Sequence, residues 1–545
     1  MASKLDKAYT VAGDGYNRWL VPTSALMVHL CVGMGYGMSV FWLPMSKIVG
    51  VAEGLGKSKA CPADMSFFGQ LFTTECDWKV VMCSVVFSIL FLMLGTTTAI
   101  FGNWLEHAGP RRCGLYSCIC FCSFFFLMAV SAAVHQLWLA WLSSFIGGVG
   151  LGLGYITPVS TLIRWFPDRV GMATGMAVAG FGGGAMVGAP LAQQLIGLFG
   201  TSTSVGLWQC FAVLGAVYTV FMLMGCFTIK VPKPGYKPEG WEPPAPKDGH
   251  KSDAFNVETS KAVRTPQFWC CWFMLFLNIA AGIGVLAMAS PLLQEVFAGD
   301  LIKMPGVAYD ALTDAQKGQV AMIAAGFAGL LSLFNILGRF VWASLSDKVG
   351  RRAVYYLFAA GGACLYASLP TLASSLNLVL FLVVTCLCVS FYGGGYAVIP
   401  AYLNDLFGQQ FVGAIHGRVL TAWSAAGLLS PLFINVLREY QLNNGVAKAA
   451  AYSTTLYCMA VLLVIEIVFI TLIRPVNPKF HMTPEEFAVA KAELEDKMKE
   501  AQASGVAPTV EVSSSGTLII RWLIVGIPLA YGVAMTAIQT AKMFI

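Results

Sequence analysis

The sequence predicts an all-α integral membrane protein, and three observations lead to that fold class. Apolar residues make up 57% of the 545 residues, charged residues only 11%, and the mean hydropathy is +0.70. A soluble globular protein carries roughly 25% charged residues. The apolar residues are grouped in blocks of about 20, the length at which a helix spans a bilayer. The blocks are continuous, which excludes the alternating pattern of a membrane β-barrel.

Thirteen such blocks follow one another along the chain. The first is too long for the core of a signal peptide and has no clear cleavage site, so we interpret it as a retained span. The predicted spans lie near residues 22–46, 79–104, 113–134, 137–162, 170–198, 206–228, 267–291, 319–343, 353–374, 377–403, 412–437, 451–474 and 517–541.

Basic residues are distributed unevenly between the segments that connect the spans. If the N-terminus is cytoplasmic, the inside segments up to residue 450 carry 17 Lys and Arg residues and the outside segments carry 8. The positive-inside rule therefore predicts a cytoplasmic N-terminus. Because topology accounts for these basic residues, we expect no nucleic-acid partner.

The cysteines and other reactive side chains argue against an enzyme. Most of the sixteen cysteines lie within spans, where cysteine behaves as a small hydrophobe, and no C-x-x-C pair occurs. No Ser/His/Asp set, metal-ligand cluster or phosphate loop stands out, so no cofactor, metal or catalytic residue is predicted. Cys61 and Cys76 share the first external loop and could form a disulfide if that side is oxidising.

A proline-rich polar segment at 229–266 divides the first twelve spans into two sets of six. Proline at this density favours an extended linker. The two sets, 1–228 and 267–475, are predicted to be copies of one unit, of the kind that rocks around a site at the membrane midplane. Three landmark pairs recur at one offset of 241 residues: Gly109 and Gly350, Tyr155 and Tyr396, and Pro190 and Pro431.

The chain continues beyond the duplicated unit. The stretch 483–503 is predicted to be a cytoplasmic helix capped by Thr483, within a linker that covers 476–516. A last apolar block in 517–545 predicts a thirteenth transmembrane helix, which places the C-terminus outside.

Two charged clusters resemble the signature of the major facilitator superfamily. They read G-N-W-L-E-H-A-G-P-R-R from Gly102 and A-S-L-S-D-K-V-G-R-R from Ala343, which replaces the usual leading glycine. The resemblance covers residues 18–475 and implies two six-helix halves related by pseudo-two-fold symmetry. It also implies a gating or conformational role for the cluster residues Glu106 (in place of the usual Asp), Arg111, Arg112, Asp347, Arg351 and Arg352.

A narrower resemblance is to the oxalate/formate antiporter family, which is related to monocarboxylate transporters. It rests on G-Y-G-M-S-V-F-W-L-P at 35–44, on G-x-G-Y-x-x-P at 152–158, and on R-W-F-P-D-R-x-G-M-A-T-G-M-A-V-A-G-F-G-G-G-A at 164–185. The thirteenth span resembles a small accessory membrane segment that accompanies some bacterial members, which favours a bacterial inner membrane. We expect a monomeric transport unit.

Arg339 stands in predicted span eight, eight residues before Asp347 and roughly 12 Å from the membrane surface. Burial there costs about 2.5–3.5 kcal/mol, so the side chain needs a partner. It could extend to the interface or pair with a carbonyl. We prefer a bidentate bond to a substrate carboxylate, as the resemblance to monocarboxylate transporters implies, because span eight contains no other charge. Asn335 lies one turn away, where those carriers often have Asp, which argues against proton coupling at that position.

Further site residues are predicted around the same cavity. Oxalate carriers line their site with tyrosines and tryptophans in the spans concerned, although ordinary helix packing explains each residue alone equally well. The histidine among them could carry a coupled proton, but we prefer a structural role for it. The residues are His29 and Tyr36 in span one, Tyr155 in span four, and Tyr392 and Tyr396 in span ten.

Trp423 stands where oxalate carriers place a lysine. One fixed cation in place of two favours a monocarboxylate such as formate, lactate or pyruvate over oxalate. We therefore expect a secondary active transporter of small carboxylates in a lipid bilayer, coupled to a proton or a counter-anion. The alternatives are a facilitator for another small anion or a neutral solute, and a membrane sensor that binds carboxylates without moving them.

Overall fold

The structure is a computed structural model that describes residues 5–55, 58–62, 65–233, 235–242, 256–483 and 514–541, with 485, 486, 489, 492 and 496. These residues form long helices, and no strand occurs among them. The all-α fold class is confirmed. The predicted helix at 483–503 lies almost wholly outside the described residues, as does the middle of the proline-rich linker.

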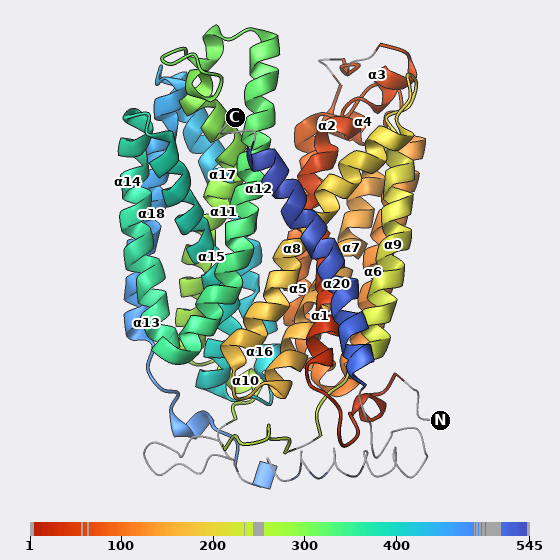
Figure 1. The fold of residues 1–545 in the computed structure, drawn as a ribbon, viewed down its shortest axis with the longest axis vertical. Coiled ribbons are helices and arrows are strands. Elements are labelled where there is room, and N and C mark those ends of the chain that lie inside the picture. The colour runs from red at the N-terminus through yellow and green to blue at the C-terminus, as the bar shows by residue number, and fades with distance from the viewer. Residues whose placement is uncertain are drawn as a thin grey trace.

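The described part of the first half contains six long helices (Figure 1). The first changes character at Val32, after which the stretch Gly33–Phe41 continues as the 3-10 helix η2. Gly33 allows this part of the chain to pack closely on the backbone at Phe181, because a Cβ on residue 33 would collide with the Phe181 carbonyl. The helices are α1 (Leu20–Val32), α5 (Val80–Ala108), α6 (Pro110–Val134), α7 (Leu137–Trp165), α8 (Val170–Phe199) and α9 (Leu207–Thr228).

The second half repeats this arrangement. Its first helix begins at Pro266, and Thr265 caps it by accepting the N–H of Phe268. The ninth span is continuous but contains a π-helical turn, a feature frequent at functional positions. The elements are α11 (Pro266–Leu301), α12 (Asp314–Val349), α13 (Arg351–Tyr356), η5 (Leu357–Gly361), α14 (Gly362–Ser374), α15 (Leu378–Phe407), α16 (Val412–Val419), α17 (Thr421–Asn443) and α18 (Lys448–Leu472).

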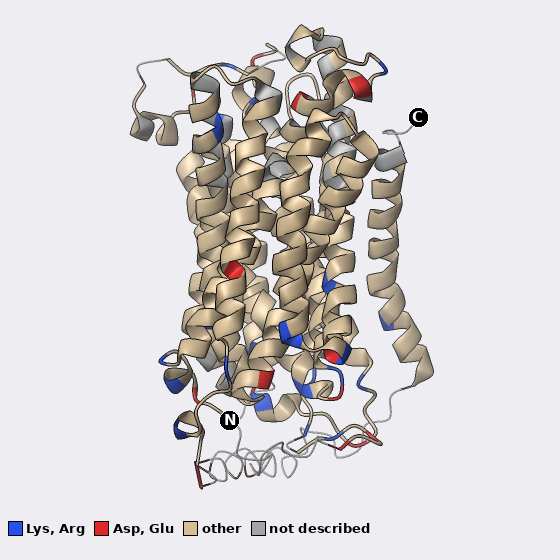
Figure 2. Ribbon diagram, turned by 90° about the vertical axis from the view of Figure 1, so that its left-hand side faces the viewer, with Lys and Arg blue, Asp and Glu red and all other residues tan. Residues whose placement is uncertain are grey.

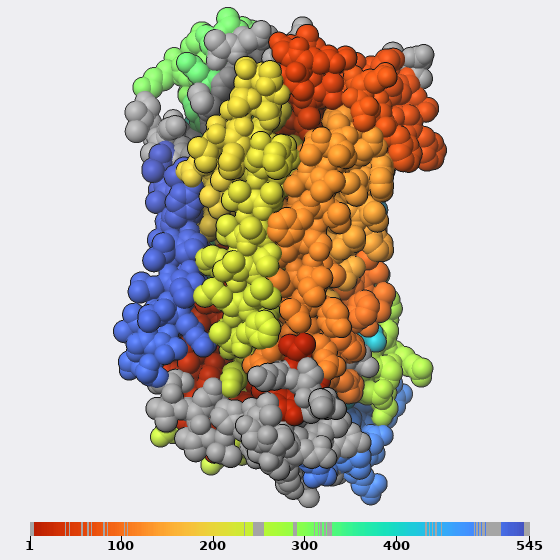
Figure 3. Space-filling view, turned by 90° about the vertical axis from the view of Figure 1, so that its right-hand side faces the viewer, coloured from red at the N-terminus to blue at the C-terminus, as the bar shows by residue number. Residues whose placement is uncertain are grey.

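Eleven of the described helical segments are long and apolar enough to cross a membrane. Charged residues gather toward the two ends of the helical body and are sparse between them (Figure 2). Helix α12 and the pair α16–α17 occupy the positions of predicted spans eight and eleven. The last helix, α20 (Ser515–Ala541), lies on the outside of the bundle against α1, α8 and α12 (Figure 3). That α20 crosses the membrane as a thirteenth span stays a prediction.

The two halves make close contacts near the end of the molecule that carries the N-terminus, which we call the N-terminal end (Figure 1). There α5 packs on α16, and α8 packs on α12. A Cβ on Gly175 would lie 2.8 Å from the Arg339 carbonyl, and one on Gly102 would lie 3.0 Å from the Cα of Ala414. Glycine therefore lets the helices of opposite halves approach closely at this end.

A loop before α5 covers the opposite end of the first half. Cys61 and Cys76 form the disulfide that the sequence allowed, and Asp77 accepts three backbone N–H groups of the loop. His135, between α6 and α7, stacks on Trp78 at 4.3 Å, and its Nε2 lies 2.9 Å from the Cys76 carbonyl. Burial lowers the pKa of His135, against the opposing effects of this carbonyl and of Asp77.

Candidate substrate site

Arg339 lies on α12 between the two halves and is completely buried. Its Nε donates to Asn335 Oδ1 at 3.0 Å, and its Nη1 donates to the carbonyl of Val178 on α8 at 2.8 Å. The guanidinium is therefore directed into the protein, with a carbonyl partner, and does not extend to the membrane interface. Among the described side chains, no Asp or Glu pairs with it. A guanidinium has five N–H groups, so donors remain for a further acceptor.

Three tyrosines enclose this cation. The central guanidinium carbon of Arg339 lies 5.2 Å from the ring centre of Tyr396 and 5.6 Å from that of Tyr36, distances at which a cation and an aromatic face attract. The Tyr36 hydroxyl lies 3.5 Å from Arg339 Nη2 and 3.5 Å from the Tyr392 hydroxyl. Because Tyr36 belongs to η2 and the other two belong to α15, both halves contribute to the enclosure.

Trp423 of α17 packs beside the tyrosines that surround Arg339. It is fully buried, and its ring centre lies 6.1 Å from Tyr36 and 6.3 Å from Tyr396. Phe91 of α5 lies 4.5 Å from Trp423, and Phe181 of α8 lies 5.0 Å from Tyr36. Sequence reasoning missed both phenylalanines, although Phe181 could have been noticed as an aromatic residue within a glycine-rich stretch.

His29 is held between the backbones of two neighbouring helices. Its Nε2 lies 2.9 Å from the Tyr155 carbonyl of α7, and its Nδ1 contacts the Ala177 carbonyl of α8. Its ring also stacks on Tyr155 at 5.5 Å. These contacts agree with the structural role that we prefer for His29, which stays a prediction.

Several buried polar atoms in the region around Arg339 have no hydrogen-bond partner of normal geometry within the described structure. They are the hydroxyls of Tyr155 and Tyr396, Nε1 of Trp423, and both ring nitrogens of His416 on α16. The Tyr155 ring lies 5.6 Å from Tyr396 and 5.9 Å from His416. Buried polar groups are nearly always satisfied, so this region has unused capacity for a polar ligand or water. His416 was not predicted, because no sequence pattern distinguishes it.

We refer to Arg339 and these aromatic residues as the Arg339 cluster. It contains every predicted substrate-site residue, and the structure brings all of them together. Its members are His29, Tyr36, Tyr155, Asn335, Arg339, Tyr392, Tyr396 and Trp423, together with Phe91, Phe181 and His416.

Part of the predicted gating set joins the halves at the N-terminal end. Asp347, at the end of α12, accepts the backbone N–H groups of Gly171 at 2.8 Å and Met172 at 3.0 Å in the first turn of α8. A carboxylate is favourable at a helix N-terminus. Arg351 lies 2.6 Å from Asp347 and 3.2 Å from Asp405 of α15. Asp347 therefore links α8 of one half to three elements of the other.

The other described gating residues connect elements within one half. Glu106 lies on α5, and its side chain is outside the described part of the structure. The bonds are Arg111 to the Phe227 carbonyl at 3.2 Å, Arg112 to Asp6, and Arg352 to the Thr471 carbonyl at 2.9 Å. A conformational role for the six residues stays a prediction.

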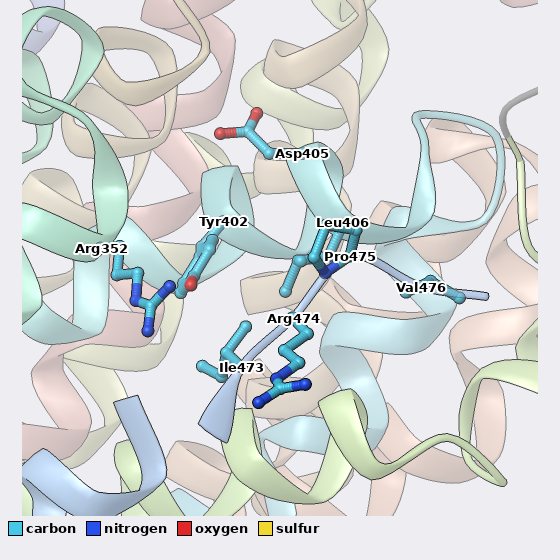
Figure 4. A pocket seen from close by; sticks show the side chains of 8 residues that line it. All are labelled: Arg352, Tyr402, Asp405, Leu406, Ile473, Arg474, Pro475 and Val476. Atoms are coloured by element: carbon cyan, nitrogen blue, oxygen red, sulfur yellow. The ribbon is translucent and has the colours of Figure 1, made fainter. Parts of the chain in front are cut away.

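A cavity of about 230 Å³ lies at the N-terminal end (Figure 4). Arg352, Tyr402 and Asp405 line it, together with the segment 473–476 that follows α18. None of its lining residues belongs to the Arg339 cluster. Arg352 and Asp405 already have protein partners, so we assign this cavity no substrate.

The fold and the enclosed cation define a membrane protein whose two halves share one central site, the architecture of an alternating-access transporter. The chain belongs to the Major Facilitator Superfamily, whose family profile matches residues 25–431 and 313–544. It is therefore a membrane transporter and not an enzyme, and the resemblance read from the sequence is confirmed.

Several relatives have functions in their names, among them an antiporter and a carrier. The oxalate:formate antiporter of Oxalobacter formigenes is 25% identical over 345 residues, which cover 63% of this chain and 72% of the relative. The apicoplast pyruvate carrier 1 of Toxoplasma gondii is 24% identical over 360 residues, covering 58% and 62%. Among solved structures, the proton:xylose symporter XylE matches with a TM-score of 0.55 and 14% identity, over 87% of this chain and 100% of that one. At that identity the likeness concerns the fold alone.

Proposed function

We propose that the chain transports small monocarboxylates by alternating access and that Arg339 binds the substrate carboxylate. The observation that carries the proposal is a fully buried guanidinium between the halves, without an acidic partner among the described side chains. Arginine at membrane depth requires compensation, and a backbone carbonyl is a neutral acceptor that leaves the charge unbalanced. A carboxylate supplies both the opposite charge and two acceptors that match the guanidinium fork.

The surroundings of Arg339 support a substrate with one carboxylate. At position 423, where oxalate carriers have a lysine, this chain places an aromatic ring against Tyr36 and Tyr396. In the described part of the chain, Arg339 is the one cation that lies over the tyrosine rings of the cluster. A single charge matches formate, lactate or pyruvate better than oxalate.

The unsatisfied polar atoms next to Arg339 give the substrate further contacts. The hydroxyls of Tyr155 and Tyr396 and the ring nitrogens of His416 have no partner of normal geometry, so the hydroxyls and the one N–H of a neutral His416 can donate to a carboxylate, keto or hydroxyl oxygen. The relatives that transport formate, oxalate and pyruvate by name agree with this substrate class. We place the N-terminal end on the cytoplasmic side of the membrane, following the distribution of basic residues.

Uptake into proteoliposomes tests the proposal. We expect saturable uptake of labelled formate, lactate or pyruvate, and we expect oxalate to be a weaker competitor than these acids. A pH gradient and an internal counter-anion, applied separately, distinguish proton symport from antiport. Binding of these acids without flux would identify a sensor instead. Transport of a neutral solute, with no response to carboxylates, would identify a different transporter.

A further inference from the structure

A second charged residue is buried in the second half, apart from the Arg339 cluster. Glu466 on α18 is fully buried. Its Oε2 accepts a long hydrogen bond of 3.5 Å from Nδ2 of Asn278 on α11, and its Oε1 has no partner. Among the described side chains, Glu466 forms no ion pair. A carboxylate without a cation is costly to bury, so the fold needs a reason to keep it.

The acid–amide pair of Glu466 and Asn278 has too many acceptors and too few donors. Oδ1 of Asn278 is buried and unpartnered, as is Oε1 of Glu466. A proton on the Glu466 carboxyl would add the donor that the pair lacks, and after a side-chain adjustment the acid and the amide would be able to exchange two hydrogen bonds. The ionised pair leaves both oxygens unsatisfied, at the full cost of their desolvation. The pair therefore lacks one donor, which a proton on the Glu466 carboxyl would supply.

None of the described titratable groups around Glu466 supplies a positive charge that pairs with its carboxylate. Tyr355 of α13 interacts with Glu466, and Cys271 of α11 and Tyr402 of α15 lie next to Tyr355. Arg352 of α13 donates instead to a carbonyl five residues farther along α18. Of the other elements packed against α18, η5 carries no titratable residue, and the described titratable side chains of α14 and α17 are Cys364, Tyr366, Arg438 and Tyr440.

The acid–amide pair is connected to the substrate site through α15. Oδ1 of Asn278 packs against Gly395, where a Cβ would collide with it, so only glycine admits this approach. The Gly395 carbonyl also accepts the Tyr355 hydroxyl. Gly395 directly precedes Tyr396, whose ring lies 5.2 Å from the guanidinium of Arg339. A change in the pair therefore reaches the substrate site through adjacent residues of one helix.

We propose that Glu466, together with Asn278, is a proton-binding site and that the chain carries one proton with each monocarboxylate. This inference rests on the proposed function, because the carboxylate is the co-substrate. Arg339 would balance the charge of the bound anion while Glu466 holds the proton. The anion and the proton together would carry no net charge across the membrane. Asn335 beside Arg339 has no titratable proton to take this role.

Proteoliposomes with labelled pyruvate as the probe test the inference. For the unaltered chain we expect a pH gradient, acidic outside, to drive accumulation, and an internal pH dye to report acidification as pyruvate enters. Glu466→Gln should lose both effects but keep pyruvate counterflow at equal pH, since glutamine retains an amide partner for Asn278 without a titratable proton. The matched control is Glu295→Gln, on the same helix as Asn278 and paired with Arg438 at 2.6 Å. It should keep gradient-driven accumulation.

Each outcome separates the inference from the proposed function. Pyruvate transport without proton movement overturns the inference and leaves the proposed function standing. Gradient-driven accumulation that persists in Glu466→Gln also overturns it, as does accumulation driven by a sodium gradient alone. No carboxylate transport by the unaltered chain overturns the proposed function as well.

A chemical test covers the case in which Glu466→Gln does not fold. Dicyclohexylcarbodiimide modifies protonated carboxyl groups in apolar surroundings. An adduct on Glu466, found by mass spectrometry of the unaltered chain and accompanied by loss of gradient-driven uptake, supports the inference. A chain that stays unmodified at Glu466 overturns it.

Discussion

Nη1 of Arg339 donates to the carbonyl of Val178 at 2.8 Å, and these two residues belong to different halves of the duplicated fold. A proposed substrate carboxylate that bonded to Nη1 would compete with this neutral acceptor, because a hydrogen bond between two charged groups is the stronger one. In the proposed function, substrate binding would therefore act on a bond between α12 and α8. This contact provides a physical link between occupancy of the site and the relative position of the halves.

Replacement of Arg339 by Gln keeps hydrogen bonding but removes the charge. We expect the loss of a charge-assisted bond worth about 1.5–3 kcal/mol, or roughly ten- to hundredfold in affinity. Arg339→Lys should also bind poorly, because a point charge does not reproduce the fork. The measurement is anion binding by purified, monodisperse variants. Near-normal affinity in Arg339→Gln would contradict the assigned role.

Trp423→Lys introduces a second cation into the Arg339 cluster. Two cations match two carboxylates, so we expect recognition of oxalate to improve relative to formate. Competition of each acid against labelled formate measures this ratio. Trp423→Phe, which keeps an aromatic ring without the charge, is the control and should leave the preference for formate. An unchanged ratio in well-folded Trp423→Lys would show that position 423 does not contact the substrate.

Asp347→Asn removes the charge that α12 contributes to the first turn of α8. We expect the contact at the N-terminal end to weaken by about 1 kcal/mol. Hydrogen exchange at the amides of Gly171 and Met172 should then become faster. Asp14→Asn is the control, since Asp14 pairs with Lys233 on the surface. In this variant the amides of Gly171 and Met172 should exchange at the rate of the unaltered chain. Equal exchange rates in both variants would exclude Asp347 as a cap of α8.

The disulfide-bonded loop should lose stability in acid. Burial lowers the pKa of His135, so protonation favours the unfolded loop, where the pKa is about 6.5. The contribution of neutral His135 is therefore complete above that value and is lost as the pH falls below it. Thermal unfolding followed across this range measures the effect. His135→Phe keeps a ring that stacks on Trp78, and it should reduce the fall in unfolding temperature at acid pH. The same fall in this variant would refute the assignment to His135.

The thirteen-span prediction puts the two termini on opposite sides of the membrane. The N-terminus and the linker at 229–266 should be cytoplasmic, and the C-terminus should be outside. Tags at both ends, probed from each side in intact cells and in opened vesicles, test this arrangement. If both tags respond from the same side, α20 does not cross the membrane as predicted.

The repeat and the family resemblance together predicted several of the helices that supply the Arg339 cluster, but not the contributions of α5, α8 and α16. Tyr155 and Tyr396 occupy the same position in the two copies, and their rings lie 5.6 Å apart in the structure. Arg339 was recognisable as a lone cation in an apolar span. The Val178 carbonyl could not be predicted as its partner, because a backbone acceptor leaves no side-chain pattern in the sequence. The contact between Val178 and Arg339 also depends on how the two halves meet.

Glu466 shows a different limit of prediction. Its presence in span twelve was visible, but its partner Asn278 lies 188 residues away. Which residues of two apolar helices face each other depends on their rotation, and a span that is apolar all round carries little periodicity to fix that rotation. The same holds for His416, and the π-helical turn at Leu357–Gly361 leaves no pattern in the sequence.

Helix α20 touches α8 of the first half and α12 of the second at the same time. If the two halves move relative to each other as proposed, α20 cannot keep all of its contacts with both, so we expect the contacts on one of its faces to change in every transport cycle. Gly532 packs 3.1 Å from Met186 of α8, measured from the position of a Cβ, and α20 packs at least as extensively on α12. The outer face carries the exposed residues Ile519, Leu523 and Ile527. Drag from the surrounding lipid on this face would then set a limit on turnover, and stiffer bilayers should slow the cycle.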